Sequence, residues 1–163
     1  MAWGFATACS GSNQERTERL GGGVAQDGPA QLKVTRSPQY GPIVTDGSGR
    51  AVYRVESRRE GSRPCTEGCL VVWPVFHAGD ASAVSGDSAI SAQRIGRRAL
   101  PDGGFQVTYG GHALYYYIGD LAPGQTLGHN VEDAWGEWHL LNPSGRALDE
   151  SGRGRRGRGS DDR

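Results

Sequence analysis

Two cysteines in the pattern Cys-x-x-x-Cys, Cys65 and Cys69, are the residues best suited to chemistry in this 163-residue chain. Their thiolates, together with imidazole from the four histidines, are suitable ligands for Cu(I) or Zn²⁺. The same spacing allows a disulfide across one tight turn, which persists in an oxidising compartment. No second cysteine pair or close histidine pair completes a metal site. We therefore expect a disulfide and no bound metal, with thiol redox or copper handling outside the cytoplasm as the alternative function.

Signatures of catalysis are missing from the sequence, which contains no Gly-x-Ser-x-Gly, His-Glu-x-x-His or phosphate-loop pattern. Its acidic residues sit in Gly-rich turns, where they are common in any protein. We therefore expect no enzymatic activity and no cofactor. The 18 basic residues balance 18 acidic ones, and acidic residues flank the Arg- and Gly-rich segment 151–160. We expect no nucleic-acid partner for this reason.

Tyr115, Tyr117 and Asp120 form a second group with chemical potential. In an extended strand Tyr115 and Tyr117 face the same side. A buried tyrosine hydroxyl needs a hydrogen-bond partner, and Asp120, just past the strand, offers a carboxylate that would also lock the following turn. This structural role is the favoured interpretation, and a platform on which a ligand stacks is the alternative.

Trp73 and Trp138 are predicted to anchor the core. If they meet at the seam between two halves of the fold, they would instead line an apolar groove. His112 opens a predicted strand, where an ordinary hydrogen-bonded position accounts for it.

The elements that position these residues are short strands bounded by Gly, Asp and Asn, which predict a mainly β protein. The predicted strands are 42–45, 51–56, 105–109, 112–118 and 138–141, with one helical turn at 66–73. The hairpin that begins at Val44 can be laid over the one that begins at Val107, and a Trp follows each. A lone hairpin is unstable, so we expect a small single domain over 38–148 in which two related β-hairpin repeats share one core.

The two ends of the chain lack the apolar residues that a core needs. We expect residues 10–37 to form a flexible tether and residues 149–163 a disordered tail. Before the tether, Ala6-Thr7-Ala8-Cys9 resembles a bacterial lipobox, in which the cysteine thiol is lipidated and the chain is cut just before it. Residues 1–9 are then the remnant of a signal peptide whose true start lies upstream. The alternative is a free thiol on a frayed end.

The ordered set of motifs from Gly41 through Cys65, Cys69 and Trp73 to Asp120 resembles the bacterial predicted lipoproteins named for a Tyr-x-aromatic-x-x-Asp motif, also called the secreted repeat of unknown function. The resemblance covers residues 40–148, and the motif is Tyr115, Tyr117 and Asp120. The first repeat carries Tyr, Val and Arg at the equivalent positions 53, 55 and 58.

The resemblance implies location and architecture, because the activity of that family is unsettled. It implies a lipoprotein of the bacterial cell envelope, and from the whole sequence we expect a monomer that acts as a non-catalytic binding or structural module. Its partners would be the membrane, through the lipid on Cys9, and an envelope protein or polymer.

Overall fold

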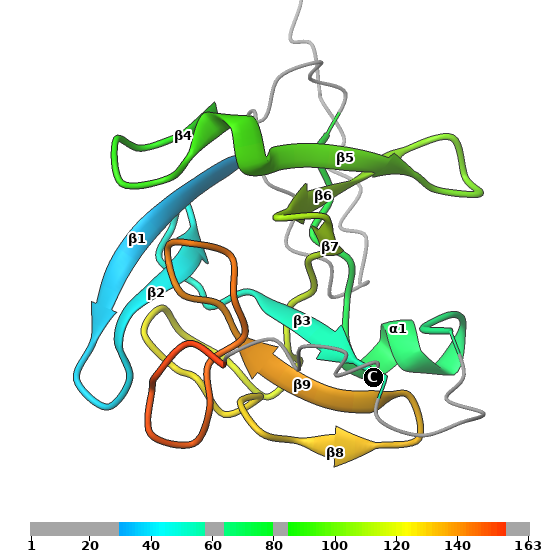
Figure 1. Cartoon of the computed structure of the whole chain (residues 1–163). Helices are drawn as coiled ribbons and strands as arrows, with labels where there is room; N and C mark the ends of the chain where they lie inside the picture. Colours follow the sequence, from blue (N-terminus) through cyan, green and yellow to red (C-terminus); the bar gives the residue numbers. More distant parts are fainter. Residues whose placement is uncertain (1–29, 58–63, 80–84, 156–163) are drawn as a thin grey trace, which may run out of the picture.

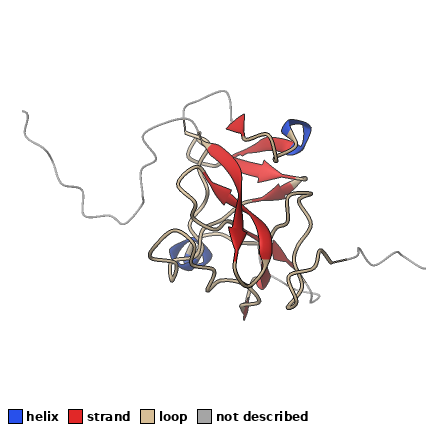
Figure 2. Cartoon of the chain, turned by 90° about the vertical axis from the view of Figure 1, so that its left-hand side faces the viewer, coloured by secondary structure: helices blue, strands red, loops and turns tan. Residues whose placement is uncertain are grey.

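The computed structural model describes residues 30–57, 64–79 and 85–155. This part of the chain is mainly β, which confirms the prediction, and its short strands are joined by turns (Figure 1). The strands are β1 (Gln31–Ser37), β2 (Gly41–Asp46), β3 (Tyr53–Glu56), β4 (Ser85–Gly86), β5 (Ile95–Ala99), β6 (Phe105–Tyr109), β7 (His112–Ala113), β8 (Glu132–Asp133) and β9 (Gly136–Leu140). The described helices are α1 (Gly68–Val72) and the 3₁₀ helix η1 (Ala92–Arg94), which lie at separate edges of the strands (Figure 2).

The strands form three small sheets, with the orders β2-β1-β4, β3-β9-β8 and β5-β6-β7. Every pairing is antiparallel except that of β1 with β4. The predicted Gly-Gly hairpin joins β6 to β7, with Tyr109 opposite His112 and positive φ at both Gly110 and Gly111. Such φ values are what a tight two-residue hairpin turn requires, and glycine adopts them without strain.

The two predicted repeats meet at Tyr53 and Tyr115, which occupy equivalent positions in their repeats. The backbone N–H of each tyrosine donates to the carbonyl of the other, over 2.8 and 2.9 Å. Residues equivalent by sequence are therefore also paired in space, as expected if a local two-fold pseudosymmetry relates the repeats.

Each repeat also pairs with the segment that follows the other one. Tyr53 of the first repeat lies opposite Leu140, and Tyr115 of the second lies opposite Val75. We call this arrangement strand exchange. The preceding strand of each repeat shows it too, because Val44 N–H donates to the Leu141 carbonyl and Val107 N–H to the Phe76 carbonyl, both over 2.9 Å. Neither repeat satisfies its backbone without the other, so the two halves form one folding unit.

Buried side chains lie in two clusters on opposite sides of these exchanged strands. Val52 and Leu114 belong to one cluster, and the next residues along the chain, Tyr53 and Tyr115, belong to the other. The alternation follows from the two-residue period of a strand. The apolar runs of the sequence therefore fill both sides of the junction between the repeats.

The predicted tether is wrong for its last seven residues, because Gln31–Ser37 forms β1. Six residue pairs join β1 to β2, and Leu32 is fully buried. Pairing satisfies the backbone of β1 and places its few apolar side chains against a core made by distant residues, so the segment needs no core of its own. Residues 10–29 of the tether lie outside the described residues, as do residues 1–9.

The start of the predicted tail is also part of the fold. Leu148 and Gly154 face each other across a turn, and the Arg155 guanidinium donates to Nε2 of the buried His139 over 3.1 Å. The same guanidinium lies 3.8 Å from Glu56 and 3.7 Å from Glu137. The prediction of disorder is wrong for residues 149–155, and the remainder of the tail lies outside the described residues.

Three turns of this fold share the sequence pattern Asp/Asn-x-Ser-Gly-Arg and one hydrogen-bond arrangement. In each, the first side chain accepts hydrogen bonds from the serine N–H, the serine hydroxyl and the arginine N–H, and the glycine has a positive φ. The turns are 46–50, 142–146 and 149–153. Because this chemistry is local, it also explains why the chain stays ordered beyond Leu148.

Candidate functional site

The helix α1 is held at one edge of the fold by the disulfide between Cys65 and Cys69, whose Cα atoms lie 5.1 Å apart. The turn that leads into α1 is closed by Cys69 N–H donating to the Thr66 carbonyl over 2.9 Å. Cys69 is fully buried, whereas Cys65 is partly exposed. The predicted disulfide is therefore present, and both sulfur atoms are bonded to each other.

A groove of about 830 Å³ opens beside this disulfide, between α1 and the sheet formed by β5, β6 and β7. Its walls are mainly apolar and come from segments far apart in the sequence. The apolar lining consists of Val55, Pro64, Cys65, Leu70, Val75, Ala99, Leu100, Pro101, Ala113 and Trp135. The volume and the apolar walls are typical of sites that bind small molecules.

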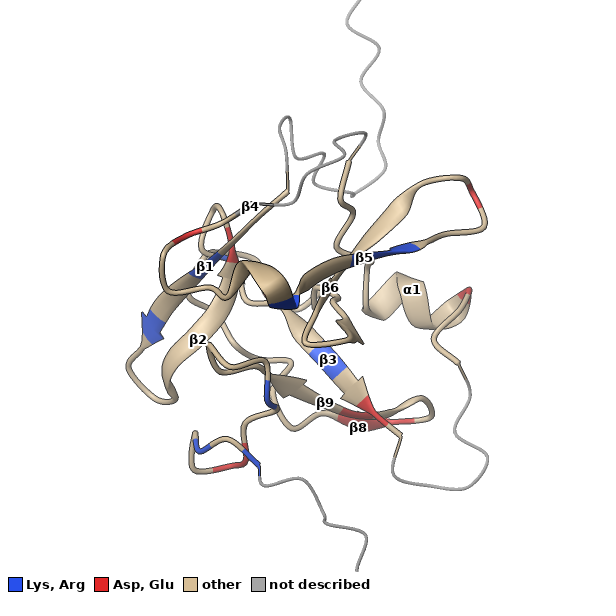
Figure 3. Cartoon of the chain, turned by 45° about the horizontal axis from the view of Figure 1, so that its top comes forward, with Lys and Arg blue, Asp and Glu red and all other residues tan. Residues whose placement is uncertain are grey.

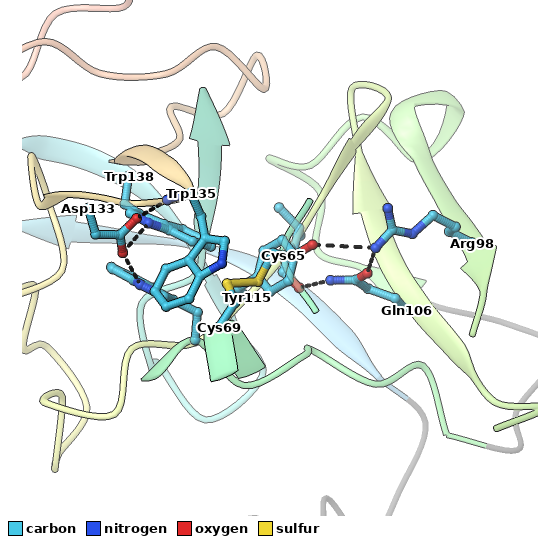
Figure 4. Close-up of a disulfide and its surroundings, with 10 residues drawn as sticks. Cys65, Cys69, Arg98, Gln106, Tyr115, Asp133, Trp135 and Trp138 are labelled. Carbon is cyan, nitrogen blue, oxygen red and sulfur yellow. Dashed lines mark hydrogen bonds between the residues drawn. A yellow bond between two sulfur atoms is a disulfide. The ribbon is translucent and has the colours of Figure 1, made fainter. Parts of the chain in front are cut away.

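Arg98 brings a positive charge to this groove from β5. Its Nη2 donates to Oε1 of Gln106 over 2.5 Å and to the Tyr115 hydroxyl over 3.3 Å (Figure 4). Gln106 is fully buried, and its own Nε2 donates to the Leu114 carbonyl over 2.8 Å. This second hydrogen bond fixes the amide so that its oxygen faces the guanidinium.

His112 also lines the groove, from the first position of β7. Burial lowers its pKa below the ordinary value of 6.5, and the positive charge of Arg54 lowers it further, while Glu56 partly opposes the shift. The imidazole is therefore neutral near pH 7. It offers the groove a hydrogen-bonding group and no charge.

Trp73 and Trp138 lie behind the groove and not in its wall. Both are fully buried, and their rings stack with centroids 3.8 Å apart and planes 6° from parallel. Each indole N–H donates to the same oxygen, Oδ2 of Asp133, over 2.9 Å (Figure 4). The tryptophan that lines the groove is Trp135, whose backbone N–H is held by the other oxygen of Asp133.

Asp120 accepts a tyrosine hydroxyl, but the donor differs from the predicted one. The hydroxyl of Tyr53, from the first repeat, donates to Asp120 over 2.6 Å, and Leu127 N–H donates to the other carboxylate oxygen over 2.8 Å. Tyr117 packs its ring against Trp73, with centroids 4.6 Å apart. Strand exchange explains the difference, because it brings Tyr53 to the turn that follows the second repeat.

Tyr116 makes a similar contact with the first repeat. Its hydroxyl donates to Oδ2 of the buried Asp46 over 3.0 Å. Burial, followed by the charge and hydrogen bond of Asp46, raises the pKa of Tyr116 far above its ordinary value of 10. Burial and the hydrogen bond to Asp120 raise the pKa of Tyr53 in the same direction. Two hydroxyl–carboxylate pairs thus tie the repeats together.

The structure separates the residues that the sequence singled out. Cys65, His112 and Tyr115 meet at the groove, whereas Trp73, Trp138 and Asp120 serve the interior. The sequence interpretation did not identify Arg98, Gln106, Leu70 or Trp135 as residues of this site. No local pattern marks these residues, because the groove forms only when segments far apart in the sequence come together.

Residues 98–142 match a family model described as a secreted repeat of unknown function. This match confirms the predicted resemblance over the second repeat, from β5 to the end of β9. No curated protein and no solved structure matches the chain. None of the helices within the described ranges has the length and apolar character needed to cross a bilayer.

Proposed function

We propose that this protein is a non-catalytic binding module of the bacterial cell envelope, held at the outer face of the membrane by a lipid on Cys9, and that it binds an apolar ligand in the groove beside the disulfide. The observation that supports this function best is the groove itself, about 830 Å³ in volume and lined mainly by apolar side chains. The description of the matching family as secreted supports the location.

The disulfide supports binding over thiol or copper chemistry. The Cys65–Cys69 bond occupies both sulfur atoms, so neither is a thiolate nucleophile or a soft metal ligand while the bond is intact. The bond instead fixes the turn that carries the groove residues Thr66 and Glu67 and leads into Leu70 of α1. A wall fixed before the ligand arrives lowers the entropy lost on binding.

A charge placed in the groove wall tests this function. With the neutral fluorescent probe N-phenyl-1-naphthylamine, we expect Leu70→Glu to weaken binding at least about 10-fold, because the probe must then desolvate a carboxylate. Val71→Glu is the matched control, since Val71 is the next residue of α1, is 67% exposed and does not line the groove. Fluorescence titration measures both. Equal affinities of the two variants, or no saturable binding by the unaltered protein, would contradict the proposal.

Lipid anchoring through Cys9, which lies outside the described residues, has a separate test. The gene with its own upstream sequence is expressed in a bacterium fed an alkyne-tagged fatty acid. We expect label on the protein and recovery in the membrane fraction, because a diacylglycerol supplies two buried chains. Cys9→Ala should abolish both signals, whereas Cys65→Ser with Cys69→Ser should retain them. Fatty-acid label on the Cys9→Ala variant would contradict lipid attachment at Cys9.

A further inference from the structure

Arg98 carries a positive charge at the groove, and no acidic side chain among the described residues forms an ion pair with it. The partners of its guanidinium, Gln106 and Tyr115, are both uncharged groups. Within residues 30–57, 64–79 and 85–155, no carboxylate lies within ion-pair distance of Arg98. One acidic residue, Glu67, lines the groove from the α1 side. The charge at the β5 side of the groove is therefore available to a bound anion.

The position of this charge is fixed by the fold. Arg98 and Gln106 are register partners in the β5–β6 pair, and Gln106 is fully buried with its amide anchored on the Leu114 carbonyl. Tyr115, which is 3% exposed, supplies the second contact to the guanidinium. Two immobile neighbours hold one end of the guanidinium, so an incoming anion meets a preorganised donor.

The rest of the groove is suited to an apolar body. Leu70 of α1, Cys65 of the turn before α1 and Trp135 of the β8–β9 turn line it, as do Leu100 and Pro101, which follow β5. Figure 3 shows basic residues on β5 and acidic residues on β8 and at the end of β3. The neutral His112 adds no second positive charge, so the site combines the Arg98 cation on the β5 side with an extended apolar wall and the acidic Glu67 on the α1 side.

We infer that the groove binds an anionic amphiphile, whose carboxylate or phosphate group pairs with Arg98 and whose apolar body lies against Leu70 and Trp135. This inference rests on the proposed binding function and adds the chemical class of the ligand. Because Nη2 donates to Gln106 and Tyr115, the anion accepts from the other N–H groups of the guanidinium, and such charge-assisted hydrogen bonds are stronger than neutral ones. Arg98 is then the residue that determines specificity for the head group.

A pair of probes with the same aromatic body isolates the contribution of the charge. N-phenyl-1-naphthylamine is neutral, and 8-anilinonaphthalene-1-sulfonate differs from it by one sulfonate group. We expect the unaltered protein to bind the sulfonate about 10-fold more tightly. Arg98→Gln should abolish that preference while leaving the affinity for the neutral probe within about twofold, because the wall is unchanged.

Arg97→Gln is the matched control for this substitution. Arg97 is the preceding residue of β5, its side chain points to the other face of the strand, and its guanidinium stacks over the Phe105 ring at 4.5 Å. We expect this variant to keep the full preference for the sulfonate. Equal binding of both probes by the unaltered protein, or a preference that survives Arg98→Gln, would overturn the inference and leave the proposed function standing. No binding of either probe would overturn both.

Competition by single-chain amphiphiles then shows whether the anionic head group of the ligand is a carboxylate or a phosphate. Dodecanoate carries the head group of a fatty acid, and dodecyl phosphate carries that of a phosphorylated lipid. Displacement of the sulfonate probe by either one supports the inference and assigns the head group that displaces more strongly. Dodecyltrimethylammonium has the same chain with a positive charge, and displacement by it at the same concentration would contradict a role for Arg98.

Discussion

Replacing Trp138 with alanine is expected to lower the free energy of unfolding by about 3–5 kcal/mol, as measured by urea denaturation followed by circular dichroism. The substitution removes two aromatic contacts from the core, because Trp138 stacks on Trp73 and meets the Tyr115 ring edge-on at 5.2 Å. Both tryptophans are fully buried, so neighbouring side chains cannot close the cavity without moving the strands that carry them.

Two further variants test whether the loss of stability comes from the stacked pair of tryptophans. Trp138→Phe keeps an aromatic ring in the stack but removes the N–H that binds Asp133, and we expect a smaller loss of about 1–3 kcal/mol. Trp135→Phe changes a tryptophan of the groove wall, which is only partly buried, and should cost less than about 1 kcal/mol. If Trp135→Phe proved as destabilising as Trp138→Ala, the stacked pair would not be the structural centre of the fold.

The sequence shows the internal repeat that brings the two tryptophans together. It does not show how the strands of the two repeats pair with each other. The alignment of Val44 with Val107 predicts two similar hairpins and a shared interior. It does not predict that Tyr53 pairs with Leu140, because a strand carries no local signal that names a distant partner. Pairing within each repeat and pairing between repeats bury the same side chains, and only three-dimensional packing distinguishes them.

The ends of the fold show which sequence signals were sufficient and which were too weak. Residues 31–37 contain only two large apolar residues, and the segment becomes a strand because β2 supplies its backbone partners. The turn at 149–153, by contrast, could have been predicted. Its Asp-x-Ser-Gly-Arg pattern matches the turn at 46–50, so local turn chemistry already indicated order beyond Leu148.

The groove was the least predictable feature. Cys65, His112 and Tyr115 were singled out for separate reasons, and none of those reasons places them in one wall. Arg98 lies in a stretch of β5 where two adjacent arginines suggest an ordinary solvated edge. The buried Gln106 distinguishes Arg98 from Arg97, and burial of one glutamine is a tertiary property that no local pattern shows.

The two buried tyrosine–carboxylate pairs predict a steep loss of stability at alkaline pH. The pKa values of Tyr53 and Tyr116 are raised in the folded protein, whereas in the unfolded chain both return to about 10. Above pH 10 the unfolded state releases these two protons and the folded state keeps them, so rising pH favours unfolding. Each tyrosine should cost about 1.4 kcal/mol per pH unit above 10, or about 2.8 kcal/mol for the pair.

Denaturation in guanidinium chloride at pH 8 to 11.5 measures this slope, and single substitutions assign it. Tyr53→Phe and Tyr116→Phe should each lower stability at pH 8 by about 1–3 kcal/mol, because each removes a hydrogen bond to a buried carboxylate. Each should also remove about half of the pH dependence above 10. Tyr117→Phe is the control, since its ring contacts Trp73, and it should leave the slope unchanged. A slope that persists in the Tyr53→Phe, Tyr116→Phe double variant would show that other groups, and not the hydroxyls joining the two repeats, govern alkaline unfolding.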